Sequence, residues 1–204
     1  MRKKGYFITF EGAEGSGKST QIRRAVAYLR RKGYSVLFLR EPGGTFIGEE
    51  IRDVILNKRH KEMKPETELL LYLAARAQLV REKILPALQK GQIVVCDRFE
   101  DSTLAYQGFG RQMGPQSISK LSPLVRGALK PDLTFLLDLE SREGLRRAGR
   151  QDRMECESLA FHRRVRRGFS ELAKGEPRRF VRLEGRLSRE ALARQVRKKL
   201  DSFL

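Results

Sequence analysis

The feature that most constrains this chain is the segment GAEGSGKS, from Gly12 to Ser19, a full match to the pattern GxxxxGK[ST]. It directly follows the apolar run Tyr6–Phe10 and precedes a stretch with helical periodicity. A glycine-rich turn between a buried strand and a helix presents backbone N–H groups that bind phosphate oxygens. The motif therefore predicts an α/β fold with a binding site for ATP.

The residue types in this turn indicate what each position does. Glycines let the backbone curl around the phosphates, the Lys18 ammonium is expected to reach the β- and γ-phosphates, and the Ser19 hydroxyl is expected to bind Mg²⁺. Lys18 is therefore a predicted catalytic residue. The predicted ATP-binding residues of the turn and the helix start are Gly12, Ala13, Glu14, Gly15, Ser16, Gly17, Lys18, Ser19 and Thr20.

A second metal ligand is expected from an acid at the end of a buried strand. Asp97 follows the run Ile93–Cys96, and Asp138 follows Phe135-Leu136-Leu137. A strand-end Asp can also serve only as a helix N-cap. We favour Asp97, because Arg98 follows it and would place an anion-binding guanidinium beside the metal.

Short apolar runs predict the strands of a parallel sheet covered by helices on both faces. The expected strands are Tyr6–Phe10, Ser35–Leu39, Ile93–Cys96, Leu133–Leu137 and Phe180–Leu183. The expected helices include Lys18–Lys32, ended by Gly33; Thr67–Lys90, kinked or shortened by Pro86; and Ser188–Phe203, with Ser188 as N-cap. Strands that alternate with helices predict one doubly wound five-stranded domain over residues 1–204.

The composition is that of a globular protein without a membrane span. Hydrophobic residues make up 40% of the 204 residues, and no run approaches the ~18 apolar residues that a span needs. Cys96 and Cys156 are the only cysteines, which fits neither a disulfide framework nor a zinc pattern. We therefore expect a cytoplasmic protein.

The formal net charge of +18 is high and is spread along the chain. Such a field attracts polyphosphates and, non-specifically, nucleic acid. We interpret much of it as solvated helix surface; a dedicated nucleic-acid site is the alternative.

Three further blocks carry a family resemblance: Arg40-Glu41-Pro42-Gly43-Gly44-Thr45, Asp97-Arg98-Phe99, and Ser102 to Gly108, which reads STLAYQG. With the phosphate loop, they make the chain resemble the thymidylate kinase family from about Tyr6 to the C-terminal helix. The resemblance implies a five-stranded parallel sheet with a mobile lid, a homodimer, and transfer of the γ-phosphoryl group of ATP–Mg²⁺ to thymidine monophosphate. It also implies a cis bond before Pro42.

The resemblance also implies an acceptor site. Glu14 matches an acid that binds the 3′-hydroxyl of the acceptor sugar, and Arg40, Arg52 and Arg98 match a clamp on its phosphate, with Arg98 also counted as catalytic. Guanidinium groups suit this role because they grip phosphate oxygens bidentately.

The thymine base has its own implied contacts. Tyr72 would stack on the ring and Arg76, one helical turn later, would reach a base carbonyl. Thr103 and Gln107 would bind the polar edge of the pyrimidine, and Tyr106 would crowd the 2′ position of the sugar.

The lid, at about residues 142–154, is expected to supply a catalytic arginine. One branch of the family carries this arginine in the phosphate loop, where this chain has Gly15. The lid offers Arg146, Arg147, Arg150 and Arg153, and Arg150 is our choice for the transition-state role. Arg147 is predicted to contact ATP, by stacking on adenine.

Two other functions remain open at this point. A kinase for another nucleotide or a nucleoside would share the phosphate loop and the lid. A basic DNA-associated ATPase would use the positive charge instead, although the chain has no recognition-helix pattern and no aromatic residues interleaved with basic ones.

Overall fold

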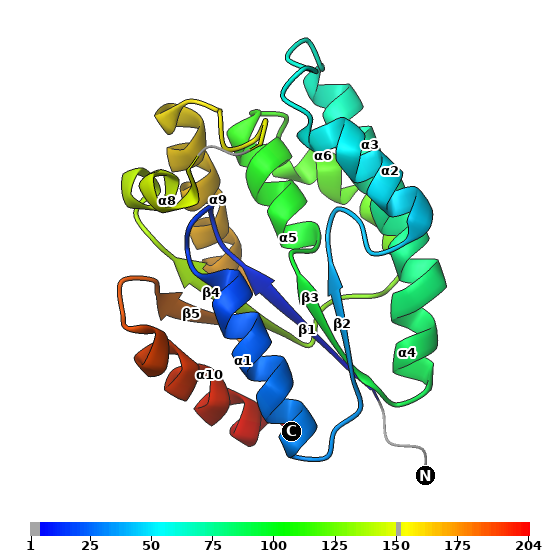
Figure 1. Ribbon diagram of the computed structural model, residues 1–204. Coiled ribbons are helices and arrows are strands. Elements are labelled where there is room, and N and C mark those ends of the chain that lie inside the picture. The colour runs from blue at the N-terminus through cyan, green and yellow to red at the C-terminus, as the bar shows by residue number, and fades with distance from the viewer. Residues whose placement is uncertain (1–4, 150–151) are drawn as a thin grey trace.

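The computed structural model describes residues 5–149 and 152–204, and its centre is a sheet of five parallel strands (Figure 1). The strand order is β2-β3-β1-β4-β5, with β1 hydrogen-bonded to both β3 and β4. The predicted five-stranded parallel α/β sheet is confirmed. The strands are β1 (Tyr6–Glu11), β2 (Val36–Arg40), β3 (Ile93–Asp97), β4 (Leu133–Asp138) and β5 (Phe180–Glu184).

Helices connect the strands and follow them in the chain. The α-helices of the described residues are α1 (Lys18–Arg31), α2 (Phe46–Leu56), α3 (Pro65–Leu79), α4 (Leu85–Gln89), α5 (Glu100–Thr103), α6 (Pro115–Ser119), α7 (Ser122–Arg126), α8 (Ser141–Ala148), α9 (Leu159–Gly175) and α10 (Arg189–Phe203). Two segments are π-helical, η1 (Val80–Ile84) and η2 (Leu104–Gly110).

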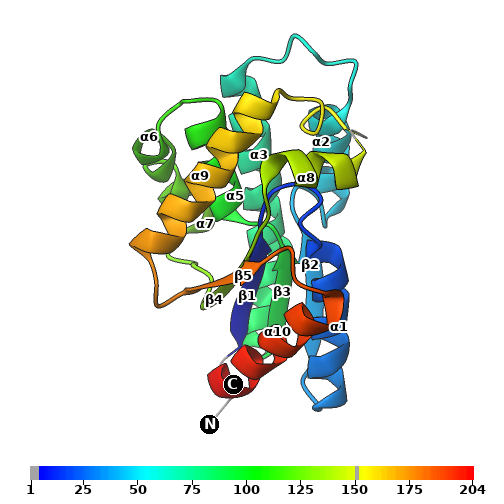
Figure 2. The ribbon, with the colours of Figure 1, turned by 90° about the vertical axis from the view of Figure 1, so that its left-hand side faces the viewer.

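The helices cover the sheet in two layers, as the side view shows (Figure 2). Successive side chains of a strand point to opposite faces, so β1 contributes to both layers. Ile8 and Phe10 pack with Ile22 of α1 and Leu192 of α10. On the other face, Phe7 belongs to a cluster with residues of α3, η1 and α4. Together these two clusters bury β1 on both faces.

The expectation that every strand is covered on both faces is wrong for β2 and β5. Both lie at edges of the sheet and each pairs on one side only. Phe38 of β2 is 44% exposed, and Arg182 of β5 is also exposed. The apolar character of a run does not reveal its place in the sheet, because edge and central strands can carry similar residues.

The predicted helix ends follow local chemistry. Gly33, with φ 84°, lies just past the end of α1, where a left-handed residue closes many helices. The Ser188 hydroxyl accepts a 3.1 Å hydrogen bond from the backbone N–H of Ala191 and caps α10, as expected.

The predicted helix Thr67–Lys90 begins two residues earlier than expected and is not uniform. The chain continues from α3 through the π-helical turn η1 into α4, and Pro86 lies at the start of α4. Proline has no N–H to donate to the carbonyl four residues earlier, and its ring crowds that carbonyl. A π turn, which widens a helix, lies just before the proline, and the helical run ends at Gln89, one residue before the predicted end.

The carboxyl ends of parallel strands share one edge of the sheet, where ligands of such folds bind. The phosphate loop, the Arg40–Glu41 segment and the Asp97–Arg98 segment follow β1, β2 and β3 at this edge. The Glu41–Pro42 bond is cis, as the resemblance implied. Within the two described ranges, no helix has the length and apolar content to cross a membrane.

Candidate active site

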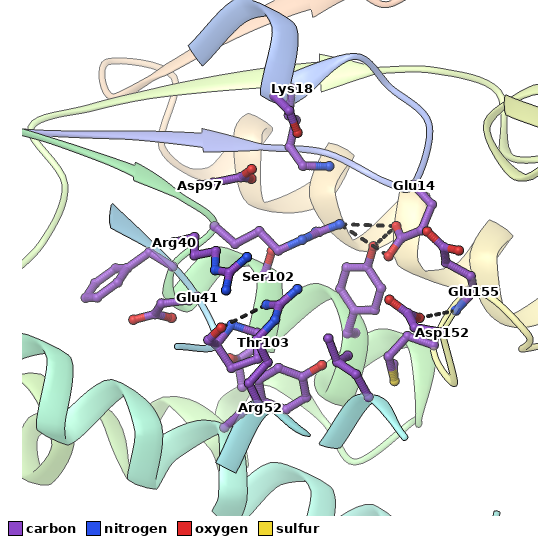
Figure 3. Close-up of a pocket in the computed structure, with 18 of the residues that line it drawn as sticks. Glu14, Lys18, Arg40, Glu41, Arg52, Asp97, Ser102, Thr103, Asp152 and Glu155 are labelled. Atoms are coloured by element: carbon purple, nitrogen blue, oxygen red, sulfur yellow. Dashed lines mark hydrogen bonds and ion pairs between the residues drawn. The ribbon is translucent and has the colours of Figure 1, made fainter. Parts of the chain in front are cut away.

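A pocket of ≈ 500 Å³ opens at this edge of the sheet. Figure 3 shows Lys18 and Asp97 toward one end of it, Arg52 toward the other, and Glu14, Asp152 and Glu155 along one side. All nine residues predicted to bind an acceptor line it: Glu14, Arg40, Arg52, Tyr72, Arg76, Arg98, Thr103, Tyr106 and Gln107. The predicted residues Gly15, Lys18, Ser19 and Asp97 line it as well.

The phosphate loop is held closed by its own lysine. The Lys18 ammonium donates to the carbonyl oxygens of Gly12, at 2.9 Å, and Ala13, at 3.0 Å. The Ser16 hydroxyl donates to the same Ala13 oxygen. Burial, together with the nearby charge of Arg98, lowers the pKa of Lys18 to about 8. A phosphate in the loop would give this ammonium anionic oxygens in place of the two carbonyl oxygens.

The position of Asp97 is suitable for a metal ligand. Its Oδ1 atom is buried and has no hydrogen-bond partner among the described residues, and Ser19 lines the same pocket. Mg²⁺ prefers such oxygen donors and keeps several waters or phosphate oxygens as further ligands. The rival Asp138 is already engaged, because Arg166, at 2.7 Å, and Arg182 both donate to its carboxylate.

Arg98 crosses from β3 to the phosphate loop. Its φ of 70° lies in the left-handed region, which a non-glycine residue adopts only when its surroundings fix it. One guanidinium nitrogen donates to the Gly12 carbonyl at 3.0 Å, and the other contacts both Glu14 oxygens at 3.2 Å. Glu14 also accepts a short hydrogen bond from Tyr106.

The charges around Glu14 keep it ionised. Burial by itself would raise the pKa of Glu14, but the charges of Arg98 and Lys18 outweigh burial and hold it below its ordinary value. The acid inside the phosphate loop is therefore neutralised by this pair of cations before any ligand binds.

Glu11, which the sequence reading missed, fixes the turn that carries Arg98. Its fully buried carboxylate accepts from the Phe99 N–H at 2.7 Å and from the Ser102 hydroxyl at 2.6 Å. Burial and the neighbouring charge of Asp101 raise its pKa to about 8. The position of Glu11, between the first apolar run and the glycine loop, could have indicated this role from the sequence.

The other two predicted clamp arginines have protein partners as well. Arg40, half-exposed, pairs with Glu49 at 2.8 Å, and Arg52 donates to the Pro42 carbonyl at 2.8 Å. Both side chains still line the pocket, so an anion placed there would meet three guanidinium groups, counting Arg98.

Arg76 is almost fully buried in the pocket wall. It donates through Nε and NH2 to one oxygen of Glu41, at 2.8 and 2.6 Å, and NH2 also donates to the Thr103 hydroxyl at 2.8 Å. Its guanidinium lies 5.1 Å from the ring centre of Phe99. The sequence predicted roles for Arg76 and Thr103. It predicted none for Glu41, although Glu41 belongs to the Arg40–Thr45 block, and in the structure Glu41 holds Arg76 in place.

The predicted lid begins with α8, which packs directly on the phosphate loop. A Cβ atom on Gly15 would lie 2.1 Å from the carbonyl oxygen of Gly144 in α8. The loop position that carries an arginine in one branch of the family therefore has no room for a side chain here. Arg147 of α8 donates to the carbonyl of Gly185, after β5.

The other predicted residues divide between the loop and places outside the pocket lining. Gly12, Ala13, Ser16 and Gly17 form the turn itself, whereas Thr20 faces the groove between α1 and α10. Arg150 lies outside the described residues. Arg153, the alternative lid arginine, is only 7% exposed and forms an ion pair with Glu68. Asp152, Met154 and Glu155 line the pocket without having been predicted.

Comparisons with known proteins agree on one family. The family model described as thymidylate kinase matches residues 10–196. A thymidylate kinase of Geobacter sulfurreducens is 52% identical over 201 residues, which cover 94% of each chain, and one of Deinococcus radiodurans is 48% identical over 196 residues, 95% of each. A crystal structure of thymidylate kinase from Ehrlichia chaffeensis superposes with a TM-score of 0.80 at 34% identity, covering 97% of this chain and 99% of that one.

The contact between Gly15 and α8 predicts a specific effect of Gly15→Ala. With φ at 65°, alanine is strained by about 1 kcal/mol and also collides with the Gly144 oxygen, so α8 must move. We expect ATP, measured by calorimetry, to bind at least about tenfold more weakly. Gly33→Ala is the matched control, because it shares the strain at φ 84° but has open space around the new methyl group. Equal ATP affinity of the two variants would contradict the role of this contact.

The lowered pKa of Lys18 predicts how stability depends on pH. In the unfolded chain Lys18 titrates near its ordinary value of 10.5, and in the fold near 8, so between these values the unfolded state binds more protons. Stability from this group therefore rises with pH across that window. Relative to Lys18→Met, the wild-type free energy of unfolding should gain about 2–3 kcal/mol between pH 7.5 and 10.5. Urea titrations measure it, with the exposed Lys198→Met as control; a pH-independent difference would refute the assignment.

Proposed function

The chain belongs to the thymidylate kinase family, and we propose how its pocket carries out the family's reaction. The enzyme transfers the γ-phosphoryl group of ATP to thymidine monophosphate and gives ADP and thymidine diphosphate, a precursor of dTTP. One observation carries the assignment of residues: a single pocket is lined at the same time by the phosphate loop with Lys18 and by the arginines Arg40, Arg52 and Arg98.

We assign the phosphate-loop end of the pocket to ATP. The N–H groups of Gly12 to Ser19 would surround the β- and γ-phosphates, and Lys18 would leave the Gly12 and Ala13 carbonyls for phosphate oxygens. Ser19 and Asp97 would hold Mg²⁺, which when bound neutralises charge on the transferring phosphate. The unpartnered Asp97 oxygen supports this pair of ligands. Arg147, beside Gly185, is assigned to the adenosine side.

We assign the part of the pocket that Arg40, Arg52 and Arg98 line to the phosphate of thymidine monophosphate. Arg40 and Arg52 would exchange their protein partners for phosphate oxygens, and Arg98, already beside the phosphate loop, would bridge the two substrates. Bidentate guanidinium contacts fix both the position and the orientation of a phosphate. An acceptor oxygen held in line with the γ-phosphate needs little further reorganisation to react.

The remaining lining residues would select the nucleoside. Glu14 would accept from the 3′-hydroxyl, and the buried ring of Tyr106, tied to Glu14, would leave no room for a 2′-hydroxyl. Tyr72 would stack on the thymine ring. Arg76, with Thr103 and Gln107, would bind its polar edge.

The transition-state arginine remains assigned to the lid, at about residues 142–154 of the single domain 1–204. The packing of α8 on Gly15 supports this proposal, because it keeps the lid segment next to the transferring phosphate. Arg150 is the proposed donor. It would neutralise charge that develops on the phosphoryl oxygens, together with Lys18.

An acceptor screen tests the proposed pocket. Steady-state kcat/KM for thymidine monophosphate should exceed that for adenosine and guanosine monophosphates and for free nucleosides, because only the pyrimidine nucleotide satisfies both the arginine clamp and the base contacts. Lys18→Ala should lower kcat at least about a hundredfold. A purine monophosphate as the better acceptor would refute the assignment, and hydrolysis of ATP stimulated by DNA would favour the nucleic-acid ATPase instead.

We also propose a homodimer formed through α2 and α3. Of the seven exposed large apolar side chains among the described residues, four lie on these helices: Phe46, Ile47, Val54 and Leu70. Phe46 is 83% exposed, so a monomer does not gain the free energy of burying this ring. A second copy would cover this surface symmetrically. The cytoplasmic location stays a prediction from the sequence.

Phe46→Glu should therefore shift the protein from dimer to monomer in sedimentation equilibrium, because a buried unpaired charge opposes association. Leu124→Glu is the matched control, since Leu124 is equally exposed but belongs to α7 and not to the proposed surface on α2 and α3. Dissociation by the control variant, or a dimer in both, would argue against this surface.

A further inference from the structure

Glu68 is a buried carboxylate that connects three separate parts of the chain. It lies on α3 one turn before Tyr72, and its side chain has no solvent exposure. One oxygen accepts from Gln107 at 2.8 Å and from Arg111 at 3.1 Å. The other accepts from Arg111 at 2.8 Å and forms an ion pair with Arg153 at 2.6 Å. Gln107 belongs to the pocket lining, whereas Glu68 and Arg153 lie behind it.

The ion pair with Arg153 anchors the segment at the end of the predicted lid. Arg153 also donates from Nε to the Ile55 carbonyl at 2.8 Å, and its backbone N–H donates to the Leu56 carbonyl. Its neighbours Asp152, Met154 and Glu155 line the pocket. The segment that borders the acceptor end therefore depends on Glu68, together with two carbonyls at the end of α2, for its position.

The hydrogen bond from Gln107 fixes which way its amide faces. An ionised carboxylate can only accept, so the Gln107 nitrogen must face Glu68 and the carbonyl oxygen remains for a donor in the pocket. Burial by itself would raise the pKa of Glu68, but the hydrogen bonds and charge of Arg111 outweigh burial and keep it below its ordinary value. Glu68 is therefore ionised at any pH used for assays.

We propose that Glu68 is a positioning residue that selects the acceptor base. By holding the amide nitrogen of Gln107, it presents the Gln107 carbonyl oxygen to a pyrimidine that carries an N3–H donor, and through Arg153 it holds the border of the same pocket. Thymine has this N3–H, whereas N3 of cytosine is an acceptor and would face the carbonyl oxygen without a hydrogen bond. This inference rests on the proposed acceptor pocket.

Glu68→Gln tests the proposal, because the new amide keeps the shape but can donate or accept. Gln107 is then free to turn over and to offer its N–H to cytosine. We expect the ratio of kcat/KM for thymidine monophosphate over deoxycytidine monophosphate to fall at least about tenfold. The KM for thymidine monophosphate should rise about tenfold, and the KM for ATP should not change. An unchanged ratio would overturn the proposal.

Arg153→Met separates the two effects. It removes the anchor of the pocket border but leaves the bond between Glu68 and Gln107, so it should raise the KM for thymidine monophosphate and leave the base ratio intact. A fall in the ratio equal to that of Glu68→Gln would show that the ratio depends on the general rigidity of the pocket and not on the orientation of the Gln107 amide.

If Glu68→Gln does not fold, Glu68→Asp takes its place. It keeps an acceptor-only carboxylate one methylene farther away, and an unchanged KM for thymidine monophosphate would then overturn the proposal.

Asp101→Asn is the control for simple loss of stability. Asp101 is also a buried helix carboxylate paired with an arginine, Arg179, at 2.7 and 3.0 Å, and it does not line the pocket. It should lower the melting temperature without moving the KM or the base ratio. A wild-type enzyme that does not turn over thymidine monophosphate would refute the proposed acceptor instead, so the two failures can be told apart.

Discussion

The parallel pairing of β1 with β3 is the constraint on which the site depends. It aligns Phe10 with Asp97, so the phosphate loop and the Asp97–Arg98 turn leave the sheet side by side. Arg98 then reaches the Gly12 carbonyl and Glu14 without any long connection. Because the two faces of β1 pack in different clusters, a one-residue slip would move each of its core side chains into the wrong cluster.

Buried and partly buried pairs of carboxylate and guanidinium groups surround the pocket: Glu14 with Arg98, Glu41 with Arg76, and Glu68 with Arg111 and Arg153. Such pairs add little net stability, because each charge loses its hydration on burial. Their effect here is preorganisation. Before a ligand arrives, each acid already holds in one orientation a side chain that faces or borders the pocket. Ligand binding therefore spends less free energy on ordering these side chains.

The two ends of the pocket differ in how firmly their cations are held. Arg76 is buried, Arg98 is half-buried, and both are bonded to acids, whereas Arg40 is half-exposed and Arg52 donates to a carbonyl. A phosphate can displace the latter pair at lower cost. The structure thus combines a fixed wall for the nucleoside with adaptable arginines for its phosphate.

Much of the site was predictable from the sequence because local chemistry determines it. The phosphate loop needs glycines and Lys18 in a fixed spacing, and the apolar runs predicted the ends of all five strands to within one residue. Tyr72 and Arg76 lie one helical turn apart, so one α-helix brings both to the pocket.

Only the tertiary structure decided which charges neutralise each other. Glu11, Glu41 and Glu68 read in the sequence as ordinary acids at a strand end, in a loop and on a helix, yet each is buried against groups 35 to 91 positions away in the chain. The same holds for Arg153, which looked like a lid arginine and is held behind the pocket wall. Sequence spacing determines local geometry, but an ion pair between distant segments exists only once the sheet has set their positions.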